Sequence, residues 1–209
     1  MTQLEPQEVA RRAAQRDSAA FAQLYDEHLN AIYRYVFYKV GDGLLAEELT
    51  AEVFSKAWER IDRFQWRNLP FQHWLIRIAR NVVVDHWRSL RRAASPIDDL
   101  REVPSEDAPP DEAISRDLEV EALRKALARL PDDQRDVLIL RFIEGYSHAD
   151  TAAALGKSVV AVRQIQVRAL RSLQKLLIGQ GAFSSVSIQT REVRVAAGRD
   201  PSPREEPAG

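Results

Sequence analysis

Apolar residues recur every three or four positions between residues 18 and 83, which is the spacing of amphipathic helices. A first stripe consists of Phe21, Leu24, Tyr25, His28, Ile32 and Tyr35. After the break at Gly41-Asp42-Gly43, a second stripe consists of Leu45, Leu49, Val53, Ala57 and Ile61. A third stripe, after Pro70, consists of Phe71, Trp74, Leu75, Ile78 and Val82. No alternating strand pattern competes, so residues 8–92 are predicted to form a helical domain.

A change in composition divides the chain into two helical modules. Residues 93–117 combine acids and serines with Pro96, Pro104, Pro109 and Pro110, which is typical of a linker. Residues 118–178 return to a helical pattern, whereas residues 179–209 are rich in glycine, serine and proline. We therefore predict an all-α protein with domains at 8–92 and 118–178, an acidic linker at 93–117 and a disordered tail at 179–209.

Turn and capping signals predict a helix-turn-helix in the second module. In chain order they are Gly145, Ser147, Asp150, Gly156 and Ser158. Gly145 ends a helix that runs from about Asp132, and Ser147 and Asp150 have the spacing of a capping box for a short helix. Gly156 allows a tight turn, and Ser158 can cap the next helix. A second helix placed in this way enters the major groove in DNA-binding helix-turn-helix proteins.

The second helix of this unit has an outward face that suits DNA. Its predicted inward positions are Val162, Ile165, Ala169 and Leu173, and its outward positions are Val160, Arg163, Gln164, Val167, Arg168 and Arg171. Ser158 is followed by Ala161 rather than by an acid, so the start of the helix is open to phosphates. Glutamine can read adenine, and arginine can read guanine. A plain helical bundle with a solvated basic helix would show the same pattern, so this alternative stays open.

The net charge of −1 conceals a strong segregation of charge. Residues 66–92 contain six arginines and one acid, and residues 157–175 contain five basic residues and no acid. Residues 98–121 contain ten acids and two arginines. Two basic modules are thus separated by an acidic segment, and the near-zero average does not argue against a nucleic-acid partner.

All four tryptophans lie between residues 58 and 87, among the arginines of the first module. Trp58 and Trp74 are expected in the core. Trp66, Arg67 and Asn68 combine an aromatic ring, a cation and an amide, which is what a site for unpaired, single-stranded bases requires. An ordinary surface loop is the alternative interpretation.

Two long segments resemble a known family. EELTAEVFSKAWERIDRF, followed by F-x6-F-x2-WLIRIARNVVVDHWR, is similar to the second conserved region of the extracytoplasmic-function sigma factors of bacterial RNA polymerase. LPDDQRDVLILRFIEGYSHADTAAALGKSVVAVR is similar to their fourth region. The resemblance covers about residues 18–176 in the order of the family.

The resemblance implies a factor that binds core RNA polymerase, directs it to promoters and helps to open the −10 element, together with an anti-sigma partner. The implied polymerase-binding residues are Glu48, Leu49, Glu52, Val53 and Phe54. The implied −10 DNA-binding residues are Trp66, Arg67, Asn68, Arg77, Arg80, Asn81 and Arg88. The implied −35 DNA-binding residues are Ser158, Val160, Arg163, Gln164, Val167, Arg168 and Arg171.

Other classes of function receive little support from the sequence. No apolar run is long enough to span a membrane, and the chain has no cysteine, so we expect a cytoplasmic protein. Its four histidines have no metal-site spacing. We find no nucleophile–base set and no phosphate-binding glycine loop, and we expect neither a cofactor nor enzymatic activity. The alternative function is a conventional helix-turn-helix regulator whose first 92 residues form a sensor or dimerisation domain.

Overall fold

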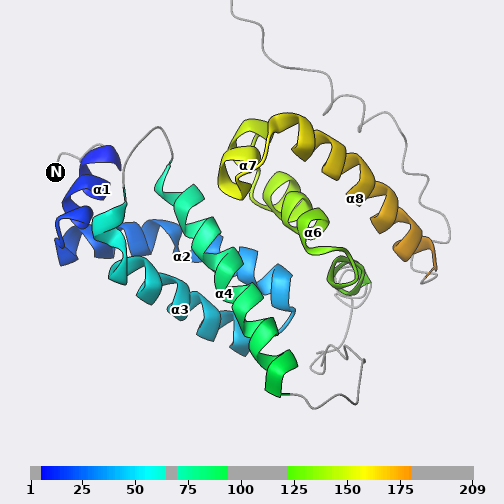
Figure 1. Ribbon diagram of the computed structural model, residues 1–209, viewed down its shortest axis with the longest axis horizontal. Coiled ribbons are helices and arrows are strands. Elements are labelled where there is room, and N and C mark those ends of the chain that lie inside the picture. The colour runs from blue at the N-terminus through cyan, green and yellow to red at the C-terminus, as the bar shows by residue number, and fades with distance from the viewer. Residues whose placement is uncertain (1–5, 65–69, 94–121, 180–209) are drawn as a thin grey trace, which may run out of the picture.

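The computed structural model describes residues 6–64, 70–93 and 122–179. These ranges contain helices and no strand, which confirms the all-α prediction. The first bundle contains α1 (Pro6–Ala14), α2 (Ser18–Val40), α3 (Gly43–Glu59), a 3₁₀ turn (Ile61–Arg63) and α4 (Phe71–Ala93). The second contains a helical segment at 122–128, α6 (Asp132–Leu138), a π-helical segment (Ile139–Ile143), α7 (His148–Leu155) and α8 (Val159–Gly179). Figure 1 shows the two bundles side by side. Most of the predicted linker and tail lies outside the described residues.

Local capping interactions set the helix boundaries of the first bundle. The Asp17 carboxylate accepts hydrogen bonds from the amides of Ala19 and Ala20 and starts α2. Gly41 ends α2 in the left-handed conformation, with φ of 81°. The side chain of Asp42 then accepts a hydrogen bond from the Leu45 amide, at 2.7 Å, and starts α3. The predicted break between the first two stripes is therefore confirmed.

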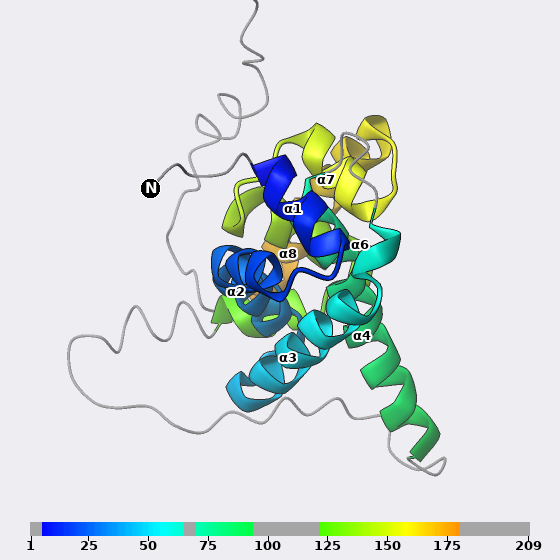
Figure 2. The same cartoon turned by 90° about the vertical axis from the view of Figure 1, so that its left-hand side faces the viewer.

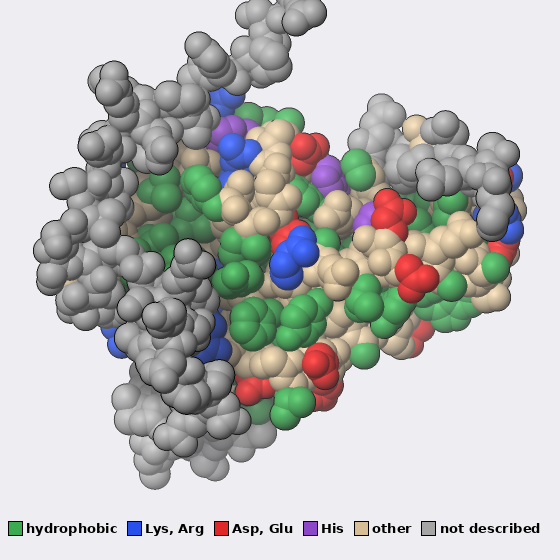
Figure 3. All heavy atoms as spheres, turned by 180° about the vertical axis from the view of Figure 1, so that it is seen from behind, with side chains coloured by type: hydrophobic (Ala, Val, Ile, Leu, Met, Phe, Trp, Pro, Cys, Tyr) green, Lys and Arg blue, Asp and Glu red, His purple; other side chains and the backbone are tan. Residues whose placement is uncertain are grey.

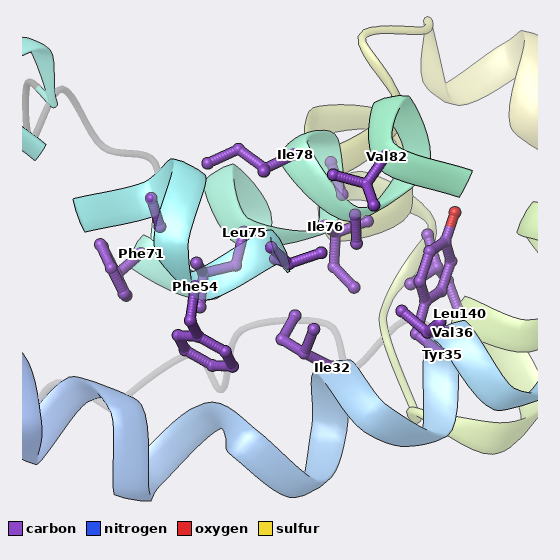
Figure 4. Packing of buried hydrophobic residues seen from close by; sticks show 14 of the residues in the cluster. Ile32, Tyr35, Val36, Phe54, Phe71, Leu75, Ile76, Ile78, Val82 and Leu140 are labelled. Carbon is purple, nitrogen blue, oxygen red and sulfur yellow. The ribbon is translucent and has the colours of Figure 1, made fainter. Parts of the chain in front are cut away.

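Most members of the three predicted stripes form the core of the first bundle, whereas Tyr25 of the first stripe is 36% exposed. Leu24, Ile32, Leu49, Val53 and Leu75 are among its fully or almost fully buried side chains. They come from α2, α3 and α4, which pack against one another. Figure 4 shows this packing from close by. Burial of each such side chain stabilises the fold by about 1.5 to 3 kcal/mol, so this core holds α4 firmly in place.

The second bundle has the predicted helix-turn-helix, with one correction. Ser147 and Asp150 form a complete capping box at the start of α7, and Gly156 makes the turn with φ of 64°. The helix expected from Asp132 to Gly145, however, is α-helical only as far as Leu138. The chain then widens into the π-helical segment, in which the amide of Glu144 bonds to the carbonyl of Ile139 at 3.0 Å. Apolar periodicity does not distinguish a short π turn from an α turn.

The two bundles share one hydrophobic core. Leu140, Tyr146 and Leu155 of the second bundle belong to the same buried cluster as Tyr35 and Val36 of α2. Figure 4 shows Leu140 beside Tyr35 and Val36. Helix α7 packs against α4, and the π-helical segment packs against α2. Figure 2 gives a second view of the two bundles. Modules that the sequence presents as separate domains are therefore docked together in this structure.

Candidate nucleic-acid interface

Successive turns of α4 carry the polar residues that the sequence assigned to DNA. Arg80 and Asn81 follow Arg77 by three and four positions, and Arg88 follows Asn81 by seven, which places them on neighbouring turns of one side of the helix. Asn81 is exposed, and Arg88 is exposed beside Asp85, with 3.4 Å between Nη1 and Oδ1. Ile78, Ala79 and Val82, which lie beside the first three, are buried, so the core fixes the direction of this part of the row. Ser89, after Arg88, is exposed.

Two arginines of this row contact the second bundle in this structure. Arg77 donates hydrogen bonds to the backbone carbonyls of Ala153 and Ala154 in α7, at 2.5 and 3.3 Å. Arg80 donates from Nε to Asp136 at 2.9 Å and from Nη2 to Asp133 at 2.7 Å. The ion pair outweighs the effect of burial, so the pKa of Arg80 is raised. Arg77 nevertheless keeps exposed surface, and the Arg80 side chain is 32% exposed, so docking engages both guanidinium groups without enclosing them.

Asp136 of α6 lies at the centre of a buried polar site between the bundles. Its Oδ1 accepts hydrogen bonds from the Tyr35 hydroxyl and from the Lys39 ammonium, both at 2.8 Å. Its Oδ2 accepts from Arg80. The carboxylate has no exposed surface, and the Lys39 side chain is 1% exposed. Burial, together with the nearby carboxylate, raises the pKa of Tyr35, so this hydroxyl remains a hydrogen-bond donor.

A second buried cation fixes the end of α2 to the second bundle. Arg135 donates from Nη1 to the backbone carbonyl of Lys39, at 2.9 Å, and from Nη2 to the carbonyls of Ala128 and Leu130. Arg124 donates to the carbonyl of Gly41. Cations near the last carbonyls of a helix are favourable because those carbonyls have no partner within the helix. The docking of the bundles thus satisfies the C-terminus of α2.

Sequence reasoning missed the polar site around Asp136. One signal for it exists in the chain: Lys39 lies four positions after Tyr35 and seven after Ile32, so a lysine occupies the apolar side of α2. A lysine in such a position needs a buried anion as its partner. The sequence does not say which of the many acids that partner is.

The outward face of α8 is as predicted. Ser158 caps the helix, because its hydroxyl accepts a hydrogen bond from the Ala161 amide at 3.1 Å. The side chains predicted to face outward are all exposed, namely Val160, Arg163, Gln164, Val167, Arg168 and Arg171. Arg163, Gln164, Val167 and Arg168 line a shallow hollow in the surface. The predicted inward residues Val162, Ile165 and Ala169 are buried. The docked second bundle therefore leaves this face open.

The residues of α3 that the resemblance assigned to polymerase binding lie partly in the core and partly on the surface. Leu49, Val53 and Phe54 are buried and therefore belong to the core of the bundle. Glu48 is exposed, and Glu52 is partly exposed and pairs with Lys56 at 2.6 Å. The exposed side of the helix also carries Glu47, Ala51, Ser55 and Leu44, of which Leu44 is 79% exposed. The surface that α3 offers to a partner is thus acidic with one prominent leucine.

The remaining predicted residues, Trp66, Arg67 and Asn68, lie outside the described residues. The positions that flank them are well anchored. The rings of Phe64 and Phe71 meet edge to face with centroids 5.2 Å apart, and both side chains are buried. Phe64 and Phe71 are thus held next to each other at the start of α4.

Two kinds of site find no support in the described part of the chain. Within residues 6–64, 70–93 and 122–179, no group of three or more histidines, cysteines or acids could hold a metal ion. Among the helices in those ranges, none combines the length and apolar character needed to cross a membrane.

On the face seen in Figure 3, the described charged side chains of both signs are interspersed with hydrophobic ones.

Both modules match models of known protein families. The model described as sigma-70 region 2 matches residues 24–93, and the model described as sigma-70, region 4, matches residues 126–175. Among similar proteins, the extracytoplasmic-function (ECF) RNA polymerase sigma factor BldN of Streptomyces coelicolor is 37% identical over 171 residues. That alignment covers 81% of this chain and 65% of BldN, so the chain spans slightly less than two thirds of that relative. The ECF RNA polymerase sigma factor SigX of Bacillus subtilis is 35% identical over 160 residues, which cover 74% of this chain and 82% of SigX.

Solved structures of two complexes contain a similar fold. CnrH, in complex with the cytosolic domain of CnrY, matches with a TM-score of 0.63 and 27% identity, over 83% of this chain and 97% of that chain. The sigma factor RpoE, in complex with the anti-sigma factor NepR from Bartonella quintana, matches with a TM-score of 0.63 and 27% identity, over 75% and 96%. Both matches extend over the two bundles.

Proposed function

Since this chain belongs to the extracytoplasmic-function sigma factors of the sigma-70 family, we propose that it binds core RNA polymerase, directs it to promoters and helps to open the −10 element. The observation that supports this proposal is the presence of two separate surfaces rich in arginine in one chain that matches both sigma-70 regions. One is the row of polar residues on α4, next to the segment 65–69, and the other is the outward face of α8. The first suits an unpaired strand, and the second suits a duplex.

The outward face of α8 would read the −35 element in the major groove. Gln164 and Arg171 offer the paired hydrogen bonds that distinguish adenine and guanine, and Val160 and Val167 offer apolar contacts to thymine methyl groups. Ser158 sits at the N-terminus of the helix, where backbone amides favour phosphate, and Arg163 and Arg168 add charge for phosphate contacts.

The −10 element would be held by α4 and the segment before it. Trp66 and Asn68 would contact an unpaired base, and Arg67 would contact its backbone. Asn81 is exposed near the middle of α4, about three turns after the start of the helix. Arg77, Arg80 and Arg88 would contact phosphates on successive turns. Binding of the strand would supply the few kcal/mol that unstacking costs, without nucleotide hydrolysis by this chain.

The acidic side of α3 would bind core polymerase. Glu48 and Glu52 would face a basic surface of the enzyme, where complementary charge speeds encounter and fixes the register. Leu49, Val53 and Phe54 would act indirectly, because they hold α3 in the core. The exposed Leu44 would supply an apolar anchor for the same partner.

An anti-sigma factor is a further proposed partner. The two structural relatives were both solved with a second protein bound: CnrH with the cytosolic domain of CnrY, and RpoE with the anti-sigma factor NepR. We expect this chain to be controlled in the same way. It would not itself be an enzyme, and it would act in the cytoplasm with the polymerase.

A conventional helix-turn-helix regulator is the alternative, and the comparisons do not favour it. It accounts for α8, but it leaves the region 2 match of residues 24–93 without a role. Transcription from purified components separates the two functions. Start sites mapped after overexpression give the promoter, and that promoter is then transcribed with core polymerase with or without this chain. A sigma factor makes transcription from core enzyme depend on the chain, whereas a conventional regulator leaves core enzyme inactive at the promoter.

A further inference from the structure

Three hydrogen-bond donors of the first bundle converge on one point. The Tyr35 hydroxyl and the Lys39 ammonium come from α2, and the Arg80 guanidinium comes from α4. All three lie 2.8 to 2.9 Å from an oxygen of the same carboxylate, that of Asp136. The donors thus belong to one bundle and the anion belongs to the other.

This arrangement is an anion site whose cations are built into the first bundle. Lys39 and Tyr35 lie on the side of α2 that faces α4, with Ile32 and Val36 buried beside them. A lysine held in that position needs an anion, because a buried cation without a partner is strongly destabilising. If the second bundle moves away, the site loses Asp136 while its three donors stay together on the rigid α2–α4 pair.

We propose that this site binds a phosphate of the promoter strand, and that Asp136 occupies it while the bundles are docked. The proposal rests on the proposed function, because it names a further contact of the strand that α4 would bind. Lys39 and Tyr35, which are absent from the predicted DNA-binding set, become strand-binding residues. Docking and strand binding then exclude each other, since a single site cannot hold two anions.

The chemistry of a phosphodiester fits the three donors. Its two unesterified oxygens carry one negative charge between them, as a carboxylate does, and both groups accept several hydrogen bonds from cations and hydroxyls. Arg80 is also one turn of α4 beyond Arg77, which the docked α7 holds through the carbonyls of Ala153 and Ala154. A strand that replaced Asp136 could therefore continue to Arg77.

In the docked form, the proposed DNA-binding surfaces of α4 and α8 differ in their contacts with the rest of the chain. Arg77 and Arg80 are engaged by the second bundle, whereas Arg163, Gln164 and Arg168 of α8 stay exposed. Docking would thus occupy Arg77, Arg80 and the buried anion site, whereas Asn81 and Arg88 of α4 and the duplex-reading helix stay exposed. If the ion cluster only stabilised the fold, removing the Asp136 charge would leave the affinity for single-stranded DNA unchanged.

The first test uses the free full-length chain and a fluorescently labelled single-stranded oligothymidylate, because phosphate contacts do not depend on base sequence. Asp136→Asn keeps the shape of the side chain and removes its charge. If the docked form makes up about 90% of the wild-type population, release of the site raises the apparent affinity about tenfold. Asp26→Asn, at an exposed position of α2, is the matched control and leaves the affinity nearly unchanged.

Asp133→Asn provides a second route if Asp136→Asn fails to fold. Asp133 accepts the other hydrogen bond of Arg80 and also pairs with Lys157, and its side chain is 44% exposed. Its substitution loosens the docked form without placing a new group in the core, and we expect a smaller gain in strand affinity. Unchanged affinity in every folded variant of this pair would overturn the proposal.

The second test uses the holoenzyme and a forked DNA that carries the mapped promoter. Lys39→Gln removes one phosphate contact, so the slope of the logarithm of affinity against the logarithm of salt concentration becomes shallower by about 0.7. Arg11→Gln, on the exposed α1, removes the same charge and leaves the slope unchanged. If wild-type holoenzyme transcribes the promoter but Lys39→Gln keeps the wild-type slope, this inference fails alone. If wild type does not transcribe, the proposed function fails.

Discussion

Arg34 on α2 and Glu144, the residue after the π-helical segment, form a two-point ion pair between the bundles. Nε of Arg34 lies 2.9 Å from Oε1 of Glu144, and Nη2 lies 2.8 Å from Oε2. The Glu144 side chain is 2% exposed and that of Arg34 is 48% exposed. The hydrogen bonds to Glu144 raise the pKa of Arg34. The pair thus adds a second polar contact between α2 and the second bundle, next in sequence to Tyr35, which bonds to Asp136.

We predict that Arg34→Ala and Glu144→Ala each lower the free energy of unfolding, and that their effects are not additive. Because half of the Arg34 side chain is in solvent, screening limits the coupling energy to about 1 kcal/mol or less. Urea denaturation of the two single variants and the double variant gives this coupling. Strict additivity would show that the pair contributes nothing to docking. Arg11→Ala with Glu8→Ala, on the exposed surface of α1, is the reference pair.

Stability should fall on mild acidification because of buried histidines. His73 of α4 lies against Tyr146, with ring centroids 5.1 Å apart, and it faces Asp150 and its neighbour Arg77. Burial lowers the pKa of His73 from 6.5, Asp150 opposes this shift, and Arg77 adds to it. Burial also lowers the pKa values of His28 and His148. In the range just below pH 6.5 the unfolded chain therefore binds more protons, and the free energy of unfolding decreases as the pH falls.

The variant His73→Phe tests this prediction. It keeps an aromatic ring beside Tyr146 and removes one titrating group, so the free energy of unfolding should depend less steeply on pH between about 5 and 6.5. Chemical denaturation at several pH values measures the slope. Ser89→Ala, which removes no titrating group from an exposed position of the same helix, is the control. If the slope changed equally in both variants, His73 would not be a cause of the loss of stability at low pH.

Arg16 combines an unfavourable backbone with favourable side-chain contacts. Its φ is 67°, and its guanidinium donates to the carbonyls of Trp58 and Glu59 and to the Asp62 carboxylate. It also lies 5.5 Å from the centre of the Trp58 ring. The side chain thus fixes the turn after α1 to the end of α3.

We predict that Arg16→Ala is less stable than Arg16→Gly. Both variants lose the contacts of the guanidinium, but alanine keeps the strain of a left-handed residue, which glycine relieves by about 1 kcal/mol. Thermal unfolding of wild type and both variants measures the difference. Equal stability of the two variants would show that the backbone of Arg16 is not strained. Wild-type stability in Arg16→Ala, which keeps the strain, would show that the guanidinium contacts do not stabilise the fold.

Asn81→Ala should impair promoter opening more than polymerase binding. Asn81 is exposed on α4, so its truncation leaves the core intact. Loss of a contact to an unpaired base costs about 1 to 3 kcal/mol, which is roughly 5- to 150-fold in the stability of the open complex. Permanganate reactivity of unpaired thymines measures opening, and a labelled chain measures binding to core enzyme. Equal losses in both assays would indicate misfolding, and Ser89→Ala on the same helix is the control.

Much of the fold follows from the sequence by itself, because the interactions involved span only a few residues. The apolar stripes repeat every three to four positions, and the caps at Asp17, Asp42 and Ser147 bond to amides two or three residues away. The outward face of α8 follows from the same periodicity. The functional roles proposed for these surfaces came from the family resemblance, because helical periodicity alone does not indicate what a surface binds.

Only the tertiary structure decided which charges are paired. Asp136 and Lys39 are 97 positions apart, and the chain offers many other acids to that lysine. Their pairing depends on the angle at which α6 meets α2 and α4, which is set by burial of Leu140, Tyr146 and Leu155 against the first bundle. For the same reason the sequence presented Arg77 and Arg80 as free for DNA, whereas docking gives them partners within the chain. Local patterns determine helices and their faces, but packing over long separations determines which face another part of the molecule covers.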